Sequence, residues 1–165
     1  MTLEEHRRSS SSARVAILAT SDTRTVETDE GGRWAQEFLE GEGHACVART
    51  VVKNDRAAIR ARLEELLAGP ADFVLVTGGT GVSARDVTAA AVTPLLDRVL
   101  PGFGELFRAL SFQEIGAAAM MSGALLGVAR GKAVACVPGS PGAVKLALTR
   151  LVGPELRHLV GELRK

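Results

Sequence analysis

The sequence is poor in the features that mark several large classes of protein. It contains no tyrosine, and aromatic residues make up only 4% of its 165 positions, which is too few for the stacking platforms of single-strand nucleic-acid binders. Its net charge is +1, so it lacks the basic surplus that neutralises a nucleic-acid backbone. We therefore expect no nucleic-acid partner.

Cysteines and long apolar runs are also scarce. The two cysteines, Cys46 and Cys136, each lie in a short apolar run, which indicates buried thiols in a reducing compartment and argues against a disulfide framework or a zinc site. No run reaches the roughly 20 residues of a membrane-spanning helix, and the N-terminus lacks the apolar core of a signal peptide. A cytoplasmic protein with no membrane association is expected.

The composition predicts one folded domain behind a short tail. Residues 1–12 are polar and end in four serines, so we expect a disordered tail there. Hydrophobic residues make up 46% of the chain, which is enough for one sizeable core. Residues 13–165 are therefore expected to form a single domain.

Short apolar runs alternate with patterns typical of amphipathic helices. Strands are expected at residues 15–20, 46–52, 72–77 and 132–137. Helices are expected between these strands, over residues 87–96 and in the region from residue 102, and at the C-terminal end. This alternation predicts a mostly parallel sheet with helices on both faces, an α/β fold.

The most informative stretch is the loop Thr77-Gly78-Gly79-Thr80-Gly81, at the end of the third strand. Glycines allow unusual backbone angles and leave peptide N–H groups uncovered, and such groups at the carboxyl end of a parallel strand can bind an anion such as phosphate. The loop matches neither the Walker A pattern nor Gly-x-Gly-x-x-Gly. Asp86, a few residues later, could hold a metal ion or cap the helix that follows; both roles stay open.

Two further strands end in loops of similar character. The first strand runs into Ser21-Asp22-Thr23-Arg24, which could equally be an ordinary polar turn, and the last strand runs into Pro138-Gly139-Ser140. Ser140 can cap a helix that begins at Pro141, as Asp29 can cap an earlier helix. In a parallel sheet all three loops open on the same edge, which favours a pocket for an anionic molecule.

Several of these motifs, in this order, resemble the molybdopterin-binding MoaB/Mog family. They are Thr77–Gly81 followed by Asp86, then Gly102-Phe103-Gly104-Glu105, Leu110-Ser111-Phe112 and Pro138-Gly139-Ser140-Pro141. The resemblance runs from about residue 14 to residue 158 and is closer to the MoaB branch. It implies a three-layer α/β/α sandwich, a role in molybdenum cofactor biosynthesis, and assembly into a homotrimer or homohexamer.

The resemblance also implies an activity and its residues. Active members adenylylate molybdopterin with MgATP, which makes molybdopterin and ATP the expected partners and Mg²⁺ the expected cofactor. By the same resemblance, Asp86 is the catalytic residue and a ligand of Mg²⁺, and Asp55 is a second catalytic carboxylate. The residues implied to bind the substrate are Ser21, Asp29, Thr77, Gly78, Gly79, Thr80, Gly81, Ser111, Pro138, Gly139 and Ser140.

Two departures from the family pattern keep other functions open. Asn54 stands where the family often has an aspartate, and Asp55 next to it could substitute for that residue or only cap a helix. Gly123 replaces the arginine of a Ser-Arg pair, which removes a phosphate contact worth roughly 1.5–3 kcal/mol. The alternatives to an adenylyltransferase are a non-catalytic molybdopterin carrier and a scaffold with a vestigial pocket.

Overall fold

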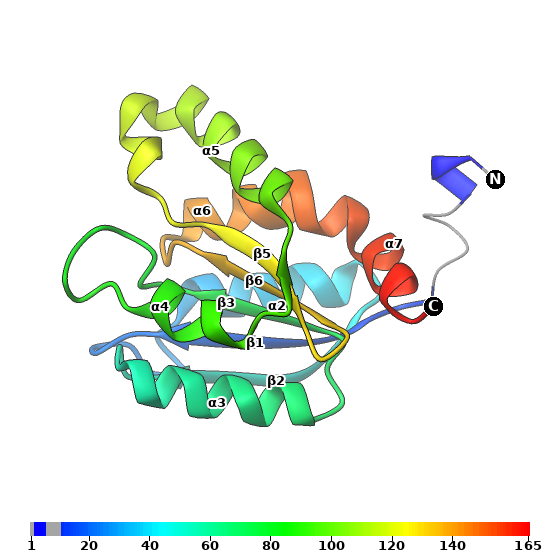
Figure 1. Cartoon of the computed structure of the whole chain (residues 1–165), viewed down its shortest axis with the longest axis horizontal. Coiled ribbons are helices and arrows are strands. Elements are labelled where there is room, and N and C mark those ends of the chain that lie inside the picture. The colour runs from blue at the N-terminus through cyan, green and yellow to red at the C-terminus, as the bar shows by residue number, and fades with distance from the viewer. Residues whose placement is uncertain (1, 6–10) are drawn as a thin grey trace.

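In the computed structural model, which describes residues 2–5 and 11–165, six strands form one sheet in the order β2-β1-β3-β6-β5-β4 (Figure 1). Strands β2, β1, β3 and β6 run parallel, whereas β5 and β4 complete the sheet in antiparallel pairing. The mostly parallel sheet is therefore confirmed. The bounds are β1 Arg14–Thr20, β2 Ala45–Val52, β3 Phe73–Thr77, β4 Arg98–Val99, β5 Leu125–Ala129 and β6 Lys132–Val137.

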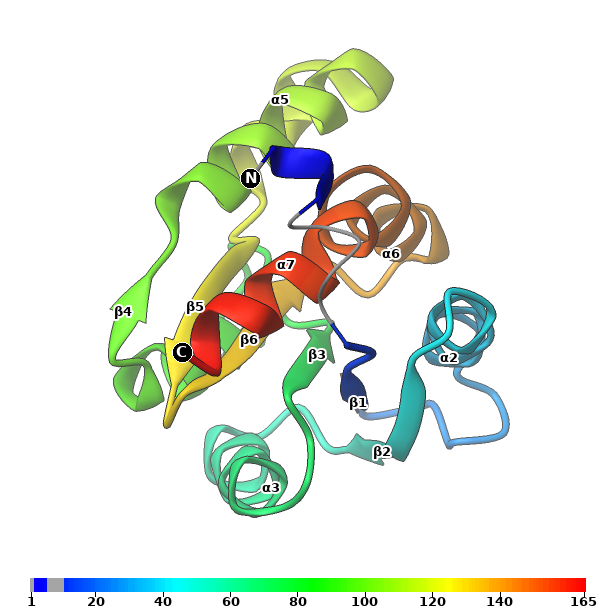
Figure 2. The ribbon, with the colours of Figure 1, turned by 90° about the vertical axis from the view of Figure 1, so that its right-hand side faces the viewer.

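Helices cover both faces of the sheet, which confirms the three-layer α/β/α architecture. Figure 2 shows α3 on one side of the sheet and α6 and α7 on the other. Short turns extend three of the helices: the 3₁₀ turn η1 (Thr93–Leu95) follows α4, the 3₁₀ turn η2 (Gly116–Met121) follows α5, and the π-helical turn η3 (Leu148–Val152) joins α6 to α7. The helices are α2 Glu30–Gly41, α3 Arg56–Ala68, α4 Thr88–Val92, α5 Pro101–Ile115, α6 Pro141–Ala147 and α7 Gly153–Leu163.

Side chains of the inner strands alternate between two cores. In β1, Val15 and Ile17 pack on the side of α2, α6 and α7, while Ala16 and Leu18 pack on the side of α3, and all four are fully buried. Strands buried on both faces give continuous apolar runs in the sequence, as seen here. Burial also raises the pKa of the Cys136 thiol in β6 to about 12, so this thiol stays protonated.

Two segments differ from the expected pattern. The helix expected over residues 87–96 ends at Val92, because Pro94 turns the chain into η1, and β4 follows. A small-residue segment after α5 contains η2 and the unexpected strand β5. Of the expected tail, Leu3–Glu5 form a helical turn, and residues 1 and 6–10 lie outside the described residues. Within the described ranges, every helix is too short or too polar to cross a bilayer.

Candidate functional site

The three loops predicted to share one sheet edge do meet there. Strands β1, β3 and β6 are neighbours and parallel, so the loops that follow them lie side by side, at the left of Figure 1. Hydrogen bonds join the three loops: the Gly78 N–H donates to Val137 O at 2.9 Å, and the Arg24 guanidinium donates to Gly139 O at 3.1 Å. We refer to residues 20–24, 77–86 and 137–141 together as the carboxyl edge.

The glycine loop is shaped so that a side chain would not fit. Gly78 and Gly79 have φ angles of 91° and 65°, in the left-handed region that favours glycine. A Cβ atom on Gly78 would lie 2.7 Å from the Thr20 carbonyl oxygen, and one on Gly79 would collide with the Thr88 hydroxyl. The loop closes on α4 through a 3.0 Å bond from Thr88 N to Gly79 O.

Peptide donors of this loop are available for a ligand. Among the described residues, none accepts a hydrogen bond from the N–H groups of Gly79, Thr80 or Gly81. Consecutive uncommitted N–H groups form a cradle for an anion. Thr77 and Thr80 are themselves buried, so their side chains anchor the loop and its backbone is the part available for binding.

Asp86 lies at the end of the same loop. Its Oδ2 accepts a bond from Ser83 N at 3.0 Å, and its own N–H donates to Ser83 O at 2.9 Å. The helix-capping role is excluded, because Val87 is the N-cap residue of α4 and α4 has no side-chain cap bond. The half-buried carboxylate therefore belongs to the loop and lies beside Gly81, where a Cβ atom would be 2.7 Å from Oδ2.

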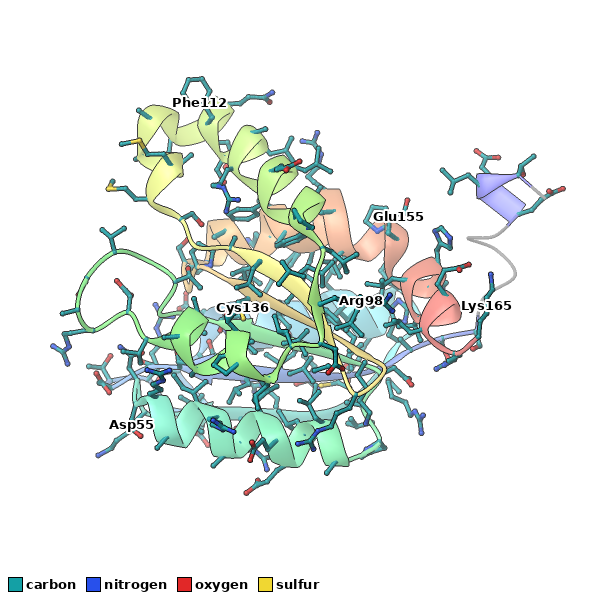
Figure 3. The ribbon with its side chains drawn as sticks, viewed as in Figure 1. Asp55, Arg98, Phe112, Cys136, Glu155 and Lys165 are labelled. Atoms are coloured by element: carbon teal, nitrogen blue, oxygen red, sulfur yellow. The ribbon has the colours of Figure 1, made fainter. Side chains whose placement is uncertain are left out.

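Asn54, not Asp55, faces the glycine loop. The Asn54 amide donates to the carbonyl oxygen of Arg85, and its Oδ1 is buried next to Gly79 with no partner among the described residues. Asp55 caps α3 by accepting from Ala58 N at 2.8 Å, and Figure 3 shows it at the start of that helix. The geometry thus gives Asp55 the capping role that the sequence left open and places an uncharged amide beside the loop.

Three charged residues that sequence reasoning did not select complete this corner. Asp22 accepts from Asn54 N at 3.0 Å through Oδ1 and from the Arg85 guanidinium at 2.9 Å through Oδ2. Arg24 and Arg85 both bring exposed cations to the carboxyl edge. Opposite charges at the ends of neighbouring parallel strands are the signal that could have identified them.

The remaining predicted residues have varied positions. Ser21 Oγ accepts from Thr23 N and Arg24 N and so shapes the first loop. Asp29 caps α2 through Oδ1 and is 1% exposed, while its Oδ2 has no partner among the described residues. Ser140 caps α6 as predicted. Ser111 is buried on the inner side of α5, outside the bonds that join the three loops.

Gly123 is explained by the close approach of its backbone to the glycine loop. Its N–H donates to Thr80 O at 2.7 Å, and a Cβ atom there would also lie 2.7 Å from that oxygen. Arg108 donates to the carbonyl oxygens of the two flanking residues, Ser122 and Ala124, at 3.2 and 3.1 Å. Any larger residue at position 123 would push this segment away from the loop.

The apolar cavities lie away from the carboxyl edge. Cavities of about 350 and 390 Å³ lie between α5 and the η3–α7 segment and share Phe103, Leu126, Glu155 and Leu159. A polar depression of about 310 Å³ lies where α2 and α6 begin, next to Trp34 and Lys145. The carboxyl edge is the more credible reactive site, because uncommitted donors and an acid converge there and the cavity lining is mostly hydrocarbon.

Comparisons with known proteins agree with the fold and the loop order. The sequence profile of a family described as "Probable molybdopterin binding domain" matches residues 16–158. A Halalkalibacterium halodurans protein named molybdenum cofactor biosynthesis protein B is 47% identical over 169 residues, which cover 100% of this chain and 99% of the relative.

Solved structures give the same result. A crystal structure of a molybdenum cofactor biosynthesis protein B has a TM-score of 0.91 at 43% identity, with 94% of this chain and 98% of the other covered. The tungsten cofactor synthesizing protein MoaB from Pyrococcus furiosus has a TM-score of 0.85 at 32% identity, with coverage of 93% and 98%. The likeness therefore extends over nearly the whole chain.

Proposed function

The chain belongs to the family of probable molybdopterin binding domains, whose members here act in molybdenum cofactor biosynthesis, and we propose that it binds molybdopterin at the carboxyl edge. We propose further that it adenylylates molybdopterin there. The observation that carries this proposal is the set of uncommitted N–H groups of Gly79, Thr80 and Gly81 next to the Asp86 carboxylate. Such a cradle suits the terminal phosphate of molybdopterin, and the neighbouring acid suits a metal-bound nucleotide.

Positive charge reinforces the anion preference of this edge. Arg24 lies against the Pro-Gly-Ser loop through Gly139 O, whereas Arg85 is paired with Asp22. Guanidinium groups bind phosphate through charge-assisted bonds. Arg24 supplies the positive charge that Gly123 cannot, because a Cβ atom at position 123 would lie 2.7 Å from Thr80 O.

The donor set at this corner fits Mg²⁺. Asp86 offers a carboxylate, Asn54 offers an amide oxygen with no partner among the described residues, and both are hard oxygen ligands. Mg²⁺ is commonly held by one or two carboxylates together with substrate phosphates, so a second acidic residue is not required. Asp86 would hold the ion, which when bound would neutralise charge on the nucleotide phosphates.

The reaction joins a molybdopterin phosphate oxygen to the α-phosphorus of ATP and breaks the bond to the β-phosphate, which leaves as pyrophosphate. Transfer of this kind depends on positioning and charge neutralisation more than on a strong base. The glycine loop would orient the attacking phosphate, and Arg24 would balance its charge. Asp86 acts as a metal ligand in this scheme and removes no proton.

A molybdopterin carrier without turnover is the second candidate. The observation that favours it is Asn54, since the residue facing the loop is neutral where a second carboxylate would strengthen metal binding. Binding requires only the peptide cradle and Arg24. Catalysis requires in addition that Asp86 hold Mg²⁺ without a second carboxylate.

Purified protein mixed with molybdopterin and MgATP separates the two candidates. We expect pyrophosphate release, and we expect Asp86→Asn to lower it by about 100-fold or more, as for loss of a group that stabilises transition-state charge. Glu64→Gln, which removes an exposed acid on α3, is the control and should leave the rate unchanged. Tight molybdopterin binding without pyrophosphate would establish the carrier, and absence of binding would reject both.

We also propose that the chain assembles into a homotrimer or homohexamer. The outer side of α5 and η2 exposes large apolar side chains, among them Phe112 and Ile115 at 61% and Met120 at 79%, and Figure 3 shows Phe112 pointing away from the body. An apolar patch of this kind marks a protein contact. Phe112→Glu should lower the mass measured by light scattering, whereas Val47→Glu on edge strand β2 should not.

A further inference from the structure

We propose that Asp22 is a positioning residue that fixes the loop segment bearing Asp86. This inference rests on the proposed function, because it assigns Asp22 a part in presenting the Asp86 carboxylate. Asp22 touches Asp86 through no bond of its own. It acts through Arg85 and Asn54, which it binds with its two carboxylate oxygens.

The contacts form a closed clamp from three strand ends. Asp22 follows β1, Asn54 follows β2, and Arg85 follows β3. Asp22 Oδ1 accepts from Asn54 N at 3.0 Å, and Oδ2 accepts from the Arg85 guanidinium at 2.9 Å. The Asn54 amide then donates to the Arg85 carbonyl oxygen, so Arg85 is held by both its side chain and its backbone.

Apart from the bonds to Asp22 and Asn54, few interactions hold the segment 81–86 in place. Its other hydrogen bonds are internal: Ser83 accepts from Arg85 N and Asp86 N, and Asp86 accepts from Ser83 N. Among the described residues, the hydrogen bonds that tie this segment to the rest of the protein all end on Asp22 or Asn54. Residues 81–85 are also exposed, so packing does not replace these bonds.

The clamp is expected to affect geometry more than stability. The Arg85 side chain is 78% exposed and that of Asp22 is 38% exposed, and ion pairs this open contribute little to folding. A displacement of the reacting groups by about 1 Å can nonetheless slow a reaction by roughly 100-fold. Loss of Asp22 should therefore leave the melting temperature unchanged and slow turnover.

A competing interpretation has Arg85 as a phosphate ligand that Asp22 withholds. Removing the Asp22 charge would then release the guanidinium, tighten substrate binding and leave the loop no more mobile. The two interpretations predict opposite results for Asp22→Asn. In that variant the amide oxygen can still accept from Asn54 N, while its NH₂ group faces the Arg85 donors and cannot bind them.

Hydrogen exchange in the protein without ligands tests the clamp directly. Asp22→Asn should speed exchange several-fold in peptides covering residues 80–88 and leave other regions unchanged. Glu64→Gln breaks the Arg60–Glu64 pair on α3, which is comparably exposed, and should not affect residues 80–88. Unchanged exchange in the Asp22 variant overturns the positioning role, whether or not the protein turns over molybdopterin.

Kinetics give the second readout. With molybdopterin and MgATP, Asp22→Asn should lower kcat by roughly 10- to 100-fold and leave KM for molybdopterin within about twofold. Asp22→Glu, which restores the charge, should recover part of kcat. A wild type that forms no pyrophosphate would reject the proposed reaction but leave the exchange result standing. A rise in kcat or a lower KM in Asp22→Asn would overturn the clamp and favour withheld Arg85.

Discussion

The buried polar groups at the two ends of the parallel strands differ in whether they have hydrogen-bond partners. At the amino edge, formed by Ala13, Arg14, His44, Asp72 and Arg164, buried polar atoms are paired. Next to the carboxyl edge, Asp29 at the start of α2 and Asn54 after β2 each leave one buried oxygen without a partner among the described residues. Native proteins pair nearly all such atoms, so a departure confined to one edge marks a functional region.

Asp72 is the centre of the amino edge. It accepts from Arg14 N at 2.8 Å, from the Arg14 guanidinium at 3.3 Å, and from Arg164 at 2.9 Å. Although burial opposes its ionisation, the bonds from Arg14 and the charge of Arg164 hold the pKa of this carboxyl below its usual value. The paired charges of the amino edge therefore serve the fold, and substitutions there should lower stability and leave molybdopterin binding intact.

The largest effect is expected at Asp72. Asp72→Ala leaves the Arg14 N–H without its acceptor and removes the carboxylate that pairs with the guanidinium groups of Arg14 and Arg164, so the free energy of unfolding should fall by about 1–3 kcal/mol. Urea denaturation measures this change. Pyrophosphate release below the unfolding transition should match that of the wild type, because the strand β3 separates this residue from the loops.

Asp72→Asn is the matched control, since its amide oxygen can still accept from Arg14 N. It should lose less stability than Asp72→Ala. Equal losses in the two variants would mean that the backbone bond contributes nothing, and a reduced rate of turnover in either would show that the two edges are coupled.

At the carboxyl edge, Gly79→Ala should impair both stability and binding. Its φ of 65° disfavours a side chain by roughly 1–2 kcal/mol, and the added carbon would meet the Thr88 hydroxyl. We expect molybdopterin affinity to fall at least about tenfold, since the cradle must move to relieve this contact. Isothermal titration gives the affinity, and denaturation gives the stability.

Gly41→Ala controls for the loss of glycine flexibility. Gly41 ends α2, and an added carbon there meets nothing within 4 Å. It should be neutral or slightly stabilising. If Gly79→Ala binds molybdopterin as well as this control does, the peptide cradle is not the binding element.

The strands and the three loops could be predicted because their signals are local. Apolar runs that end abruptly in glycine, proline or hydroxyl residues identify a buried strand and its loop together, as in the passage from Phe73 to Gly81. Parallel order then brings the loops to one edge without any knowledge of register. The family resemblance added the choice of ligand and was confirmed at the level of the family.

The antiparallel strands could not be predicted in the same way. β4 is only the exposed pair Arg98–Val99, and β5 carries Gly127 in a segment rich in small residues. Both depend on a hairpin in which Arg130 and Gly131 take positive φ angles of 52° and 73°, the geometry of a tight two-residue turn. The charges of Asp22 and Arg85 can be read from the sequence at the ends of neighbouring strands, but their bonds to each other and to Asn54 depend on the tertiary register of the loops.

A smaller effect, set by pH, is expected at His44 on the amino edge. Its Nδ1 accepts from Ala13 N at 3.0 Å, so the ring must be unprotonated at that nitrogen. Burial, helped by the positive charge of Arg157 and opposed by Glu42, lowers the pKa of this histidine below its usual 6.5. Well above pH 6.5, His44 is neutral in both the folded and the unfolded state, so its contribution to stability is complete.

As the pH falls through about 6.5, His44 binds a proton in the unfolded chain but not yet in the folded protein. The free energy of unfolding therefore declines until the pH has passed the lower pKa of the folded state. The slope contributed by one such group is at most about 1.4 kcal/mol per pH unit. Denaturation between pH 7.5 and pH 5 should show a steeper decline for wild type than for His44→Gln, which keeps an acceptor but does not titrate. Parallel curves would refute this assignment.

The smallest effect has the opposite sign and gives the sharpest test of the contrast between the edges. Asp29→Asn should raise the free energy of unfolding by about 0.5–1 kcal/mol, because a buried carboxylate with one unpaired oxygen is replaced by a neutral group that caps a helix equally well. Asp55→Asn makes the same exchange at an exposed N-cap. The interaction of each carboxylate with its helix dipole is common to both variants, so the difference between them isolates burial. If only Asp29→Asn gains stability and binds molybdopterin more weakly, the buried carboxylate is kept for binding at the expense of stability. Equal changes in the Asp29 and Asp55 variants would show that burial of Asp29 has no such role.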